Sequence, residues 1–165
     1  MTTDYGTVLG TAPADAVQDV ADTVTLDYEG RFLRRKRLST DGGGTVLVNL
    51  AETTNLTEET ALLLADGRVI AVKPADEPLL QVTGAHLIRL AWHIGNRHTP
   101  CQITQSALFI QRDHVLAEML RGLGGTVTEV TAPFRPEGGA YGHGRTMGHS
   151  HGPDEPHHHH HHGHG

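Results

Sequence analysis

The sequence predicts an α+β fold: a small all-β N-terminal domain, a second domain with the element order βαββαβ, and a disordered histidine-rich tail. Three observations predict this fold. Up to about Val72, short apolar runs alternate with turn residues and show no 3.6-residue period. Two stretches with a helical period follow, again among short apolar runs. Beyond Pro136, apolar side chains become scarce and glycine and histidine dominate.

The first domain, residues 1–74, is expected to consist of strands and tight turns. Asp41 begins a run of three glycines and Asp66 precedes Gly67, and an Asp-Gly pair between apolar runs is typical of a hairpin. Residues 73–78 are polar, contain two prolines and favour an extended backbone, so we expect them to link the two domains. The strands are expected at residues 24–28, 31–38, 45–50, 60–64 and 68–72.

The second domain, residues 75–136, is expected to contain two amphipathic helices. Apolar side chains within residues 87–94 recur at i, i+3, i+4 and i+7, and those within 116–123 follow the same pattern. Gly95 and Asn96 are expected to stop the first helix. Together with the strands, the helices give a ferredoxin-like arrangement, in which they cover one face of an antiparallel sheet. The strands are expected at residues 79–83, 102–104, 107–111 and 126–131.

The composition excludes several classes of function. The formal net charge is -6 and the pI about 6.1, so the chain lacks the basic balance of a nucleic-acid-binding protein. Cys101 is the single cysteine, which rules out an intrachain disulfide and fits a reducing compartment. The first fifteen residues hold two acids, no basic side chain and no apolar run of signal length, and no span suits a membrane helix. We expect a soluble cytoplasmic protein that binds neither nucleic acid nor membranes.

Histidine is concentrated in the tail, residues 137–165, which has too few apolar side chains to fold. Of the fourteen histidines, ten lie in the last 26 residues. Neutral imidazole binds Ni²⁺, Zn²⁺ and Cu²⁺, so the tail is predicted to bind divalent metal. The alternative is that residues 157–162 are a purification tag, although a tag alone would leave the preceding histidines unexplained. The expected tail ligands are His143, His149, His151, His157, His158, His159, His160, His161, His162 and His164.

His98 is the expected metal ligand of the folded part. It follows the end of the first helix and should lie on a loop, where proteins usually offer ligands. One imidazole holds a metal poorly, but in a two-fold dimer His98 near the axis would meet its own copy. His114, after Asp113 at the start of the second helix, is either a peripheral ligand or a solvated first-turn residue. His86 and His93 share a helix face and are expected to serve packing or an interface.

Two further features have a structural and a functional interpretation. Cys101 has H-x-x-C spacing from His98, but a lone thiol is more often a buried small hydrophobic residue. Residues 31–37 contain five basic side chains on an expected strand, which either protect a sheet edge or dock an acidic protein partner. No nucleophile motif, nucleotide loop or HExxH sequence is present, so we expect no catalytic residues and no enzyme.

Several segments resemble the UreE family of urease accessory metallochaperones: GNRH at residues 95–98, DHVL at 113–116, LDYEGR at 26–31 and the histidine tail. The resemblance covers nearly the whole chain. It implies an N-terminal domain similar to a chaperone peptide-binding domain, a ferredoxin-like metal-binding domain and a head-to-head homodimer. It also implies that Ni²⁺ is the cargo, bridged between two copies of His98 and passed through the urease accessory GTPase to the urease activation complex.

The resemblance also bears on the second site and on the choice of metal. His114 matches a peripheral metal-binding histidine of the family, but Arg112 stands where some relatives carry another histidine. Zn²⁺ and Cu²⁺ are further candidate ions. The alternative function is a histidine-rich nickel or zinc storage protein, in which the tail is the functional part and His98 is incidental.

Overall fold

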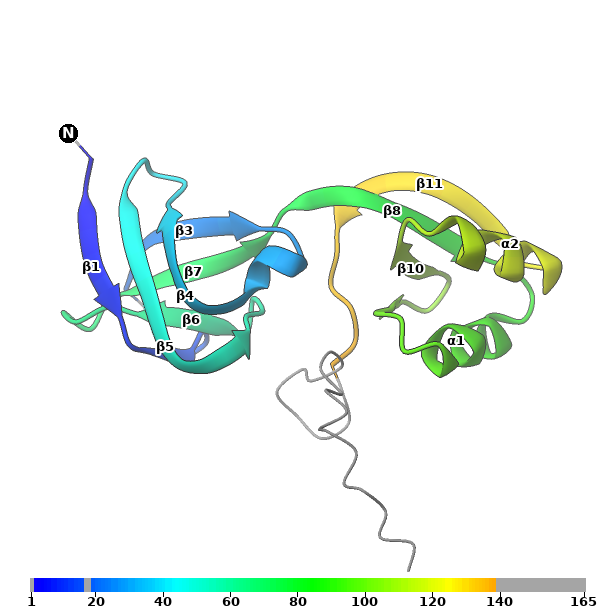
Figure 1. Cartoon of the computed structure of the whole chain (residues 1–165), viewed down its shortest axis with the longest axis horizontal. Helices are drawn as coiled ribbons and strands as arrows, with labels where there is room; N and C mark the ends of the chain where they lie inside the picture. The colour runs from blue at the N-terminus through cyan, green and yellow to red at the C-terminus, as the bar shows by residue number, and fades with distance from the viewer. Residues whose placement is uncertain (1, 17–18, 139–165) are drawn as a thin grey trace, which may run out of the picture.

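The structure is a computed structural model, which describes residues 2–16 and 19–138. Its N-terminal part is all β, and its C-terminal part combines strands with two helices, α1 and α2 (Figure 1). This confirms the predicted division into a β part followed by an α+β part. Among the described residues, no helix is both long and apolar enough to span a bilayer.

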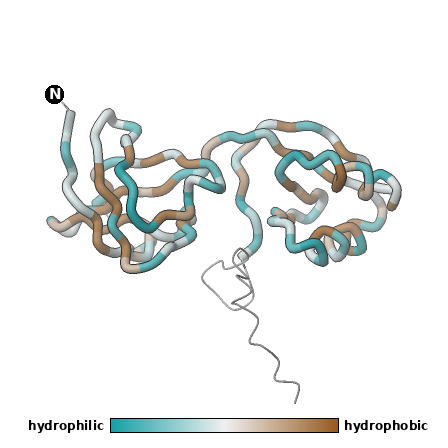
Figure 2. The backbone as a smooth tube through the Cα atoms, in the orientation of Figure 1, coloured by the Kyte–Doolittle hydropathy of each residue, from teal (hydrophilic) through white to brown (hydrophobic). Residues whose placement is uncertain are grey.

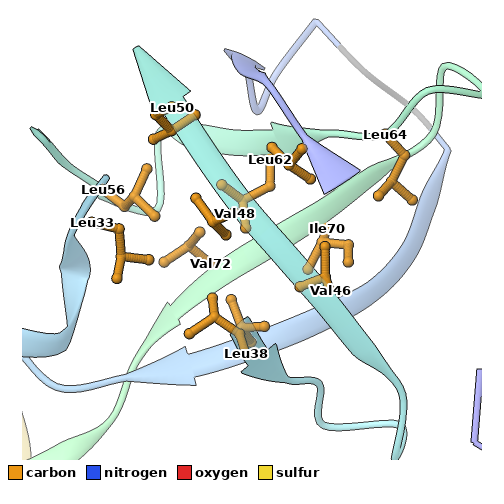
Figure 3. Packing of buried hydrophobic residues seen from close by; sticks show 12 residues of the cluster. Leu33, Leu38, Val46, Val48, Leu50, Leu56, Leu62, Leu64, Ile70 and Val72 are labelled. Atoms are coloured by element: carbon orange, nitrogen blue, oxygen red, sulfur yellow. The ribbon is translucent and has the colours of Figure 1, made fainter. Parts of the chain in front are cut away.

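Seven strands form two sheets in the N-terminal part. One sheet has the order β1-β5-β4, and the other has the order β2-β6-β7-β3. Buried aliphatic side chains from both sheets meet between them, among them Val46, Val48, Leu62 and Ile70 (Figure 3). Such a core needs only alternating apolar residues on each strand. The strands are β1 (Asp4–Val8), β2 (Gly10–Pro13), β3 (Val20–Leu26), β4 (Phe32–Ser39), β5 (Thr45–Asn55), β6 (Thr60–Leu63) and β7 (Val69–Pro74).

Both hairpins that the Asp-Gly pairs predict are present. The β6–β7 turn places Gly67 at φ 91°, and the β4–β5 turn places Gly43 at φ 88°. Both values lie in the left-handed region, which glycine enters without steric cost. The Asp22 carboxylate holds the second turn in place, since it accepts a hydrogen bond from Gly42 N–H at 3.0 Å.

Strands β1 and β2 were not predicted, because they carry almost no buried apolar side chain. Val8 is the one fully buried residue of β1, and β2 has none. The backbone holds β1 in place instead: it pairs in parallel with β5, whose sequence position is about forty residues later. Pairing over such a distance leaves no local pattern in the sequence.

Residues 73–78 connect the two parts in an extended conformation, as predicted, but they do not form a separate linker outside the strands. Strand β7 ends at Pro74 and β8 begins at Asp76, so a single residue separates two strands of different sheets. The polar character that suggested a linker comes partly from Glu77, which is buried. Its carboxylate accepts hydrogen bonds from Tyr28 N–H at 2.9 Å and from Gln111 Nε2 at 3.1 Å. Pro78 is tolerated because β8 pairs with β10 only from Leu79 onward.

The C-terminal part follows the predicted order βαββαβ. Its sheet has the strand order β11-β8-β10-β9, and every neighbouring pair is antiparallel. Leu80, Val82, Leu108 and Ile110 point from the sheet into one core that both helices cover. The elements are β8 (Asp76–Thr83), α1 (Leu87–Asn96), β9 (Gln102–Ile103), β10 (Leu108–Gln111), α2 (His114–Gly122) and β11 (Thr126–Pro133).

A third apolar cluster joins the two parts of the molecule. Tyr28 of the N-terminal part packs with Leu79 of β8 and with Phe134, and all three are buried. The rings of Tyr28 and Phe134 lie edge to face with centroids 5.4 Å apart. This cluster occupies the face of the C-terminal sheet opposite the helices, because Leu79 and Phe109 alternate with the residues that the helices cover.

Candidate metal site

His98 lies directly beyond the end of α1, outside the core and exposed, as the sequence predicted. The expected stop at Gly95 and Asn96 was wrong, since both residues belong to the helix. His98 N–H donates to Gly95 O at 2.9 Å, and Thr99 N–H donates to Ile94 O at 3.4 Å. These two bonds are those of a Schellman motif, in which the residue at the His98 position adopts the left-handed conformation.

The backbone conformation of His98 is unusual for its residue type. Its φ is 56°, and no other residue except glycine has a positive φ in the described ranges 2–16 and 19–138. Glycine normally fills this position of the motif because it has no Cβ to clash. Histidine in its place costs backbone energy, and such costs concentrate at functional positions. The strain therefore singles out the same residue as the sequence motif.

Cys101, three residues after His98, is unsuited to bind metal. Burial raises the pKa of its thiol to about 11, and the nearby Glu137 carboxylate adds to the shift. A metal-binding thiol must lose its proton, which this environment opposes. The interpretation of Cys101 as a half-buried hydrophobic residue fits the structure, since it packs against the core under α1 and α2.

The raised pKa predicts an unreactive thiol. At pH 8 a pKa of about 11 leaves roughly 0.1% thiolate, compared with about 25% for an ordinary exposed cysteine. We expect iodoacetamide to alkylate Cys101 about a hundredfold more slowly in the native protein than in the chain unfolded by guanidinium. Equal rates in the two states would contradict the burial of this thiol.

The second candidate ligand, His114, is the first residue of α2 and is exposed. Asp113 caps this helix, because its carboxylate accepts a hydrogen bond from Leu116 N–H at 3.0 Å. Arg112, two residues before His114, connects neighbouring strands and does not belong to a metal site. Its guanidinium donates to Leu79 O at 3.2 Å and to Val130 O at 3.1 Å, and it pairs with Glu129 at 2.9 Å. Arg112 is therefore a structural residue.

The candidate ligands do not form a complete site within the described part of one chain. No group of three or more His, Cys, Asp or Glu side chains in residues 2–16 and 19–138 is placed to hold one metal ion. His98 and His114 are thus single potential ligands at the ends of different helices. The predicted tail ligands lie outside the described residues: His143, His149, His151, His157, His158, His159, His160, His161, His162 and His164.

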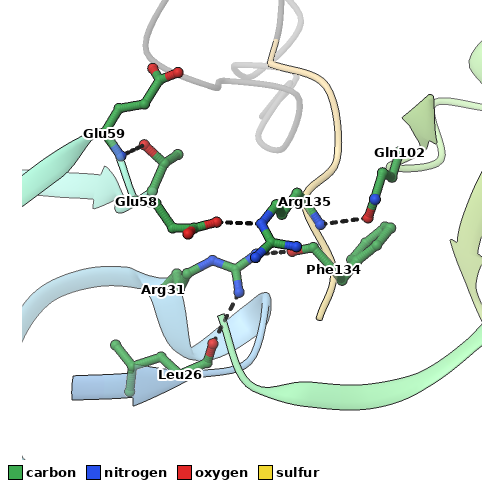
Figure 4. Close-up of polar contacts among 8 residues, drawn as sticks. Leu26, Arg31, Glu58, Glu59, Gln102, Phe134 and Arg135 are labelled. Carbon is green, nitrogen blue, oxygen red and sulfur yellow. Dashed lines mark hydrogen bonds and ion pairs between the residues drawn. The ribbon is translucent and has the colours of Figure 1, made fainter. Parts of the chain in front are cut away.

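The segment that leads into the tail runs beside the loop of His98. Arg135 N–H donates to the Gln102 side chain at 2.8 Å, and the Arg135 guanidinium pairs with Glu58 (Figure 4). Two residues later, Glu137 N–H donates to Cys101 O at 2.8 Å. Since three residues span at most about 11 Å, the last described residues lie close to His98. The start of the tail is therefore held within about 11 Å of the residue that carries the candidate ligand.

The outer face of α1 carries two exposed apolar side chains that the sequence reasoning missed. Ile88 is 89% exposed and Trp92 is 64% exposed. They stand one helical turn apart and line an open hollow together with His93 and His86. His86 precedes α1 as its N-cap residue, so the prediction that the two histidines share a helix face was wrong, although both line this hollow. The signal in the sequence was a pair of apolar residues at i, i+4 spacing outside the buried stripe of Leu87, Leu90, Ala91 and Ile94.

The chain matches two family models that together cover most of its length. Residues 7–75 match the model described as UreE urease accessory protein, N-terminal domain, and residues 77–164 match the corresponding C-terminal domain. Proteins called urease accessory protein UreE are similar over most of both chains. The protein of Cereibacter sphaeroides is 63% identical, over 81% of this chain and 72% of its own length. The protein of Ruegeria pomeroyi is 62% identical, over 79% of this chain and 87% of its own length. The protein of Rhodobacter capsulatus is 59% identical, over 86% of this chain and 90% of its own length.

Proposed function

Because the chain belongs to the UreE family of urease accessory proteins, we propose that it is a nickel metallochaperone, which binds Ni²⁺ and delivers it for assembly of the urease metal centre. The family and its relatives are accessory proteins, which confirms the prediction that the chain is not an enzyme. The observation that carries the proposal is the position of His98. It is an exposed imidazole, held in a strained conformation and next to the start of a histidine-rich tail.

The nickel ion is bound, in this proposal, between two copies of His98 in a homodimer. The exposed pair Ile88 and Trp92 supports such a dimer, because an apolar patch of this kind is costly to leave in water. The patch lies on the helix that ends at His98. A two-fold contact along α1 would bury the patch twice and bring the two imidazoles near the axis.

The tail supplies further ligands and captures the metal. His143 is six residues beyond Glu137, so an extended chain of about 20 Å suffices to carry its imidazole toward the loop of His98. Tethered ligands raise the effective concentration of metal at a nearby site without new contacts in the core. His114 acts as a weaker peripheral ligand, and Zn²⁺ and Cu²⁺ compete with Ni²⁺ for the same imidazoles.

The domain assignment is part of the same proposal. We assign residues 1–74 to a partner-binding β domain, 75–136 to a ferredoxin-like metal-binding domain and 137–165 to the tail. The strand order β11-β8-β10-β9 and the family boundaries at residues 75 and 77 support this assignment. Delivery takes place in the cytoplasm, where the protein passes Ni²⁺ to the urease accessory GTPase within the urease activation complex.

A transfer experiment tests delivery against storage. The full-length protein, loaded with Ni²⁺ and freed of excess metal, is mixed with the apo-urease activation complex, and urease activity is followed. We expect activation by the full-length protein and a lower yield, but not zero, from the chain that ends at Gly138, because the tail provides capacity. If neither protein activates urease although both carry nickel, the storage function is favoured and delivery is contradicted.

A further inference from the structure

Strand β4 carries four consecutive basic residues whose side chains are all exposed. Side chains of a strand alternate between two faces, so a strand on a core normally buries every second residue. In β4 the flanking residues Leu33 and Leu38 are buried, whereas the four residues between them are not. Figure 2 shows this stretch as a strongly hydrophilic segment of the N-terminal part. We call these four residues, Arg34, Arg35, Lys36 and Arg37, the basic edge.

The backbone of the basic edge is open on one side. Strand β4 is the outer strand of the sheet β1-β5-β4, and within the part of the chain that the structure describes it pairs with β5 alone. The pairing shifts between Leu33, opposite Thr54, and Arg35, opposite Asn49, so β5 bulges away from the start of the basic edge. An exposed strand edge of this kind offers N–H and C=O groups to another extended chain.

No residue of the basic edge forms an ion pair within the described residues. The ion pairs found there involve Arg68, Arg112, Arg121 and Arg135. The acids near the β4–β5 turn serve other groups. Asp22 accepts from the Tyr5 hydroxyl at 3.0 Å, and Asp41 accepts from the Thr25 hydroxyl at 2.8 Å.

Protection of the edge does not account for four adjacent cations. Charged side chains discourage two sheet edges from pairing, but adjacent like charges also repel one another. The chain as a whole is acidic, with a net charge of -6, so the basic edge is also opposite in sign to the rest of the molecule. A concentrated charge of one sign on an open edge favours a ligand of the other sign.

We propose that the basic edge docks an acidic, extended segment of a partner protein, which adds as a strand beside β4 and sets its carboxylates against the four cations. A second copy of this chain fits poorly, because the same edge would meet its own like charges. Nucleic acid fits less well than an acidic peptide, because the basic edge contains no aromatic side chain on which bases could stack. The proposal rests on the assignment of residues 1–74 to a partner-binding domain, names the surface and the kind of segment that it binds, and is independent of nickel binding.

Fluorescence anisotropy with the full-length protein tests the docking. The probe is a fluorescein-labelled heptapeptide of alternating Glu and Val at low ionic strength. We expect binding that weakens steeply with added salt and falls at least about tenfold in the variant R34Q/R35Q/K36Q/R37Q. The control R68Q/R121Q removes two cations from exposed ion pairs elsewhere and should keep nearly full affinity. Circular dichroism checks that both variants are folded.

Three outcomes would overturn the proposal. The first is equal peptide binding by the quadruple variant and the wild type. The second is tighter binding of an oligothymidylate than of the peptide, which would identify the edge as a nucleic-acid site. The third is unchanged binding of a peptide methylated at alternate backbone nitrogens, because strand addition requires those N–H groups. Loss of binding by the methylated peptide would support the proposal.

Discussion

Replacing His98 by glycine is expected to remove the tight nickel site and, in the same protein, to stabilise the fold. The φ of 56° at His98 costs an L-residue about 1–2 kcal/mol, which glycine avoids. Glycine gains about 0.4–1 kcal/mol of conformational freedom in the unfolded chain, which offsets part of that benefit. We therefore expect the free energy of unfolding to rise by about 0.5–1 kcal/mol, measured by chemical denaturation.

The same substitution is expected to weaken nickel binding although it stabilises the fold. If each of two His98 imidazoles contributes only about 1.4 kcal/mol, loss of both weakens Ni²⁺ binding about a hundredfold. Calorimetry on the chain that ends at Gly138 measures this without the tail, and that chain keeps the hydrogen bond from Glu137 to Cys101. If H98G binds Ni²⁺ with the affinity and stoichiometry of the wild type, His98 is not a nickel ligand.

Asparagine provides the matched control for the same position. It tolerates the left-handed conformation better than most residues but has no imidazole. The variant H98N should match the wild type in stability and H98G in nickel binding. H114N, by contrast, should lower the affinity or stoichiometry only slightly, because His114 stands at the start of another helix.

The sequence could identify His98 but not the conformation that makes it unusual. A histidine after a helix, within GNRH, is visible in the sequence, and so is a tail rich in imidazole. The sequence predicted that the helix ends before Gly95, because glycine is a common stop signal. In the structure the helix continues through Asn96, and the chain turns at His98. Which residue adopts a positive φ depends on how the helix packs, and this packing involves contacts distant in sequence.

The same distinction between local and distant information explains which parts of the fold were predictable. Helices α1 and α2 bury one stripe of apolar residues each, so their period reveals them. Strand β1 pairs through its backbone, and its one fully buried residue, Val8, gives no period. The burial of Glu77 within the polar segment 73–78 could not be predicted, because its partners, Tyr28 and Gln111, lie 49 and 34 residues away.

Replacing Phe134 by alanine is expected to cause the largest loss of stability among single substitutions at the junction of the two parts. Phe134 is fully buried against Tyr28 and Leu79, so its removal leaves a cavity where the N-terminal part meets the C-terminal sheet. Phenylalanine-to-alanine changes in a core cost about 3–5 kcal/mol. The neighbouring bond from the Arg31 guanidinium to Phe134 O, at 2.5 Å, would be disturbed as well.

The junction also has a consequence for the metal site, which distinguishes this substitution from an ordinary core variant. Phe134 precedes Arg135 and Glu137, which fix the start of the tail beside Gln102 and Cys101. In F134A, the midpoint of denaturant unfolding should fall, and the two parts should unfold in separate transitions. Nickel transfer from the tail to His98 should also be slower than in the wild type. F134L, which keeps most of the apolar volume, should cost less than about 1.5 kcal/mol and preserve a single transition. Equal stability of F134A and F134L would show that the junction does not couple the two parts.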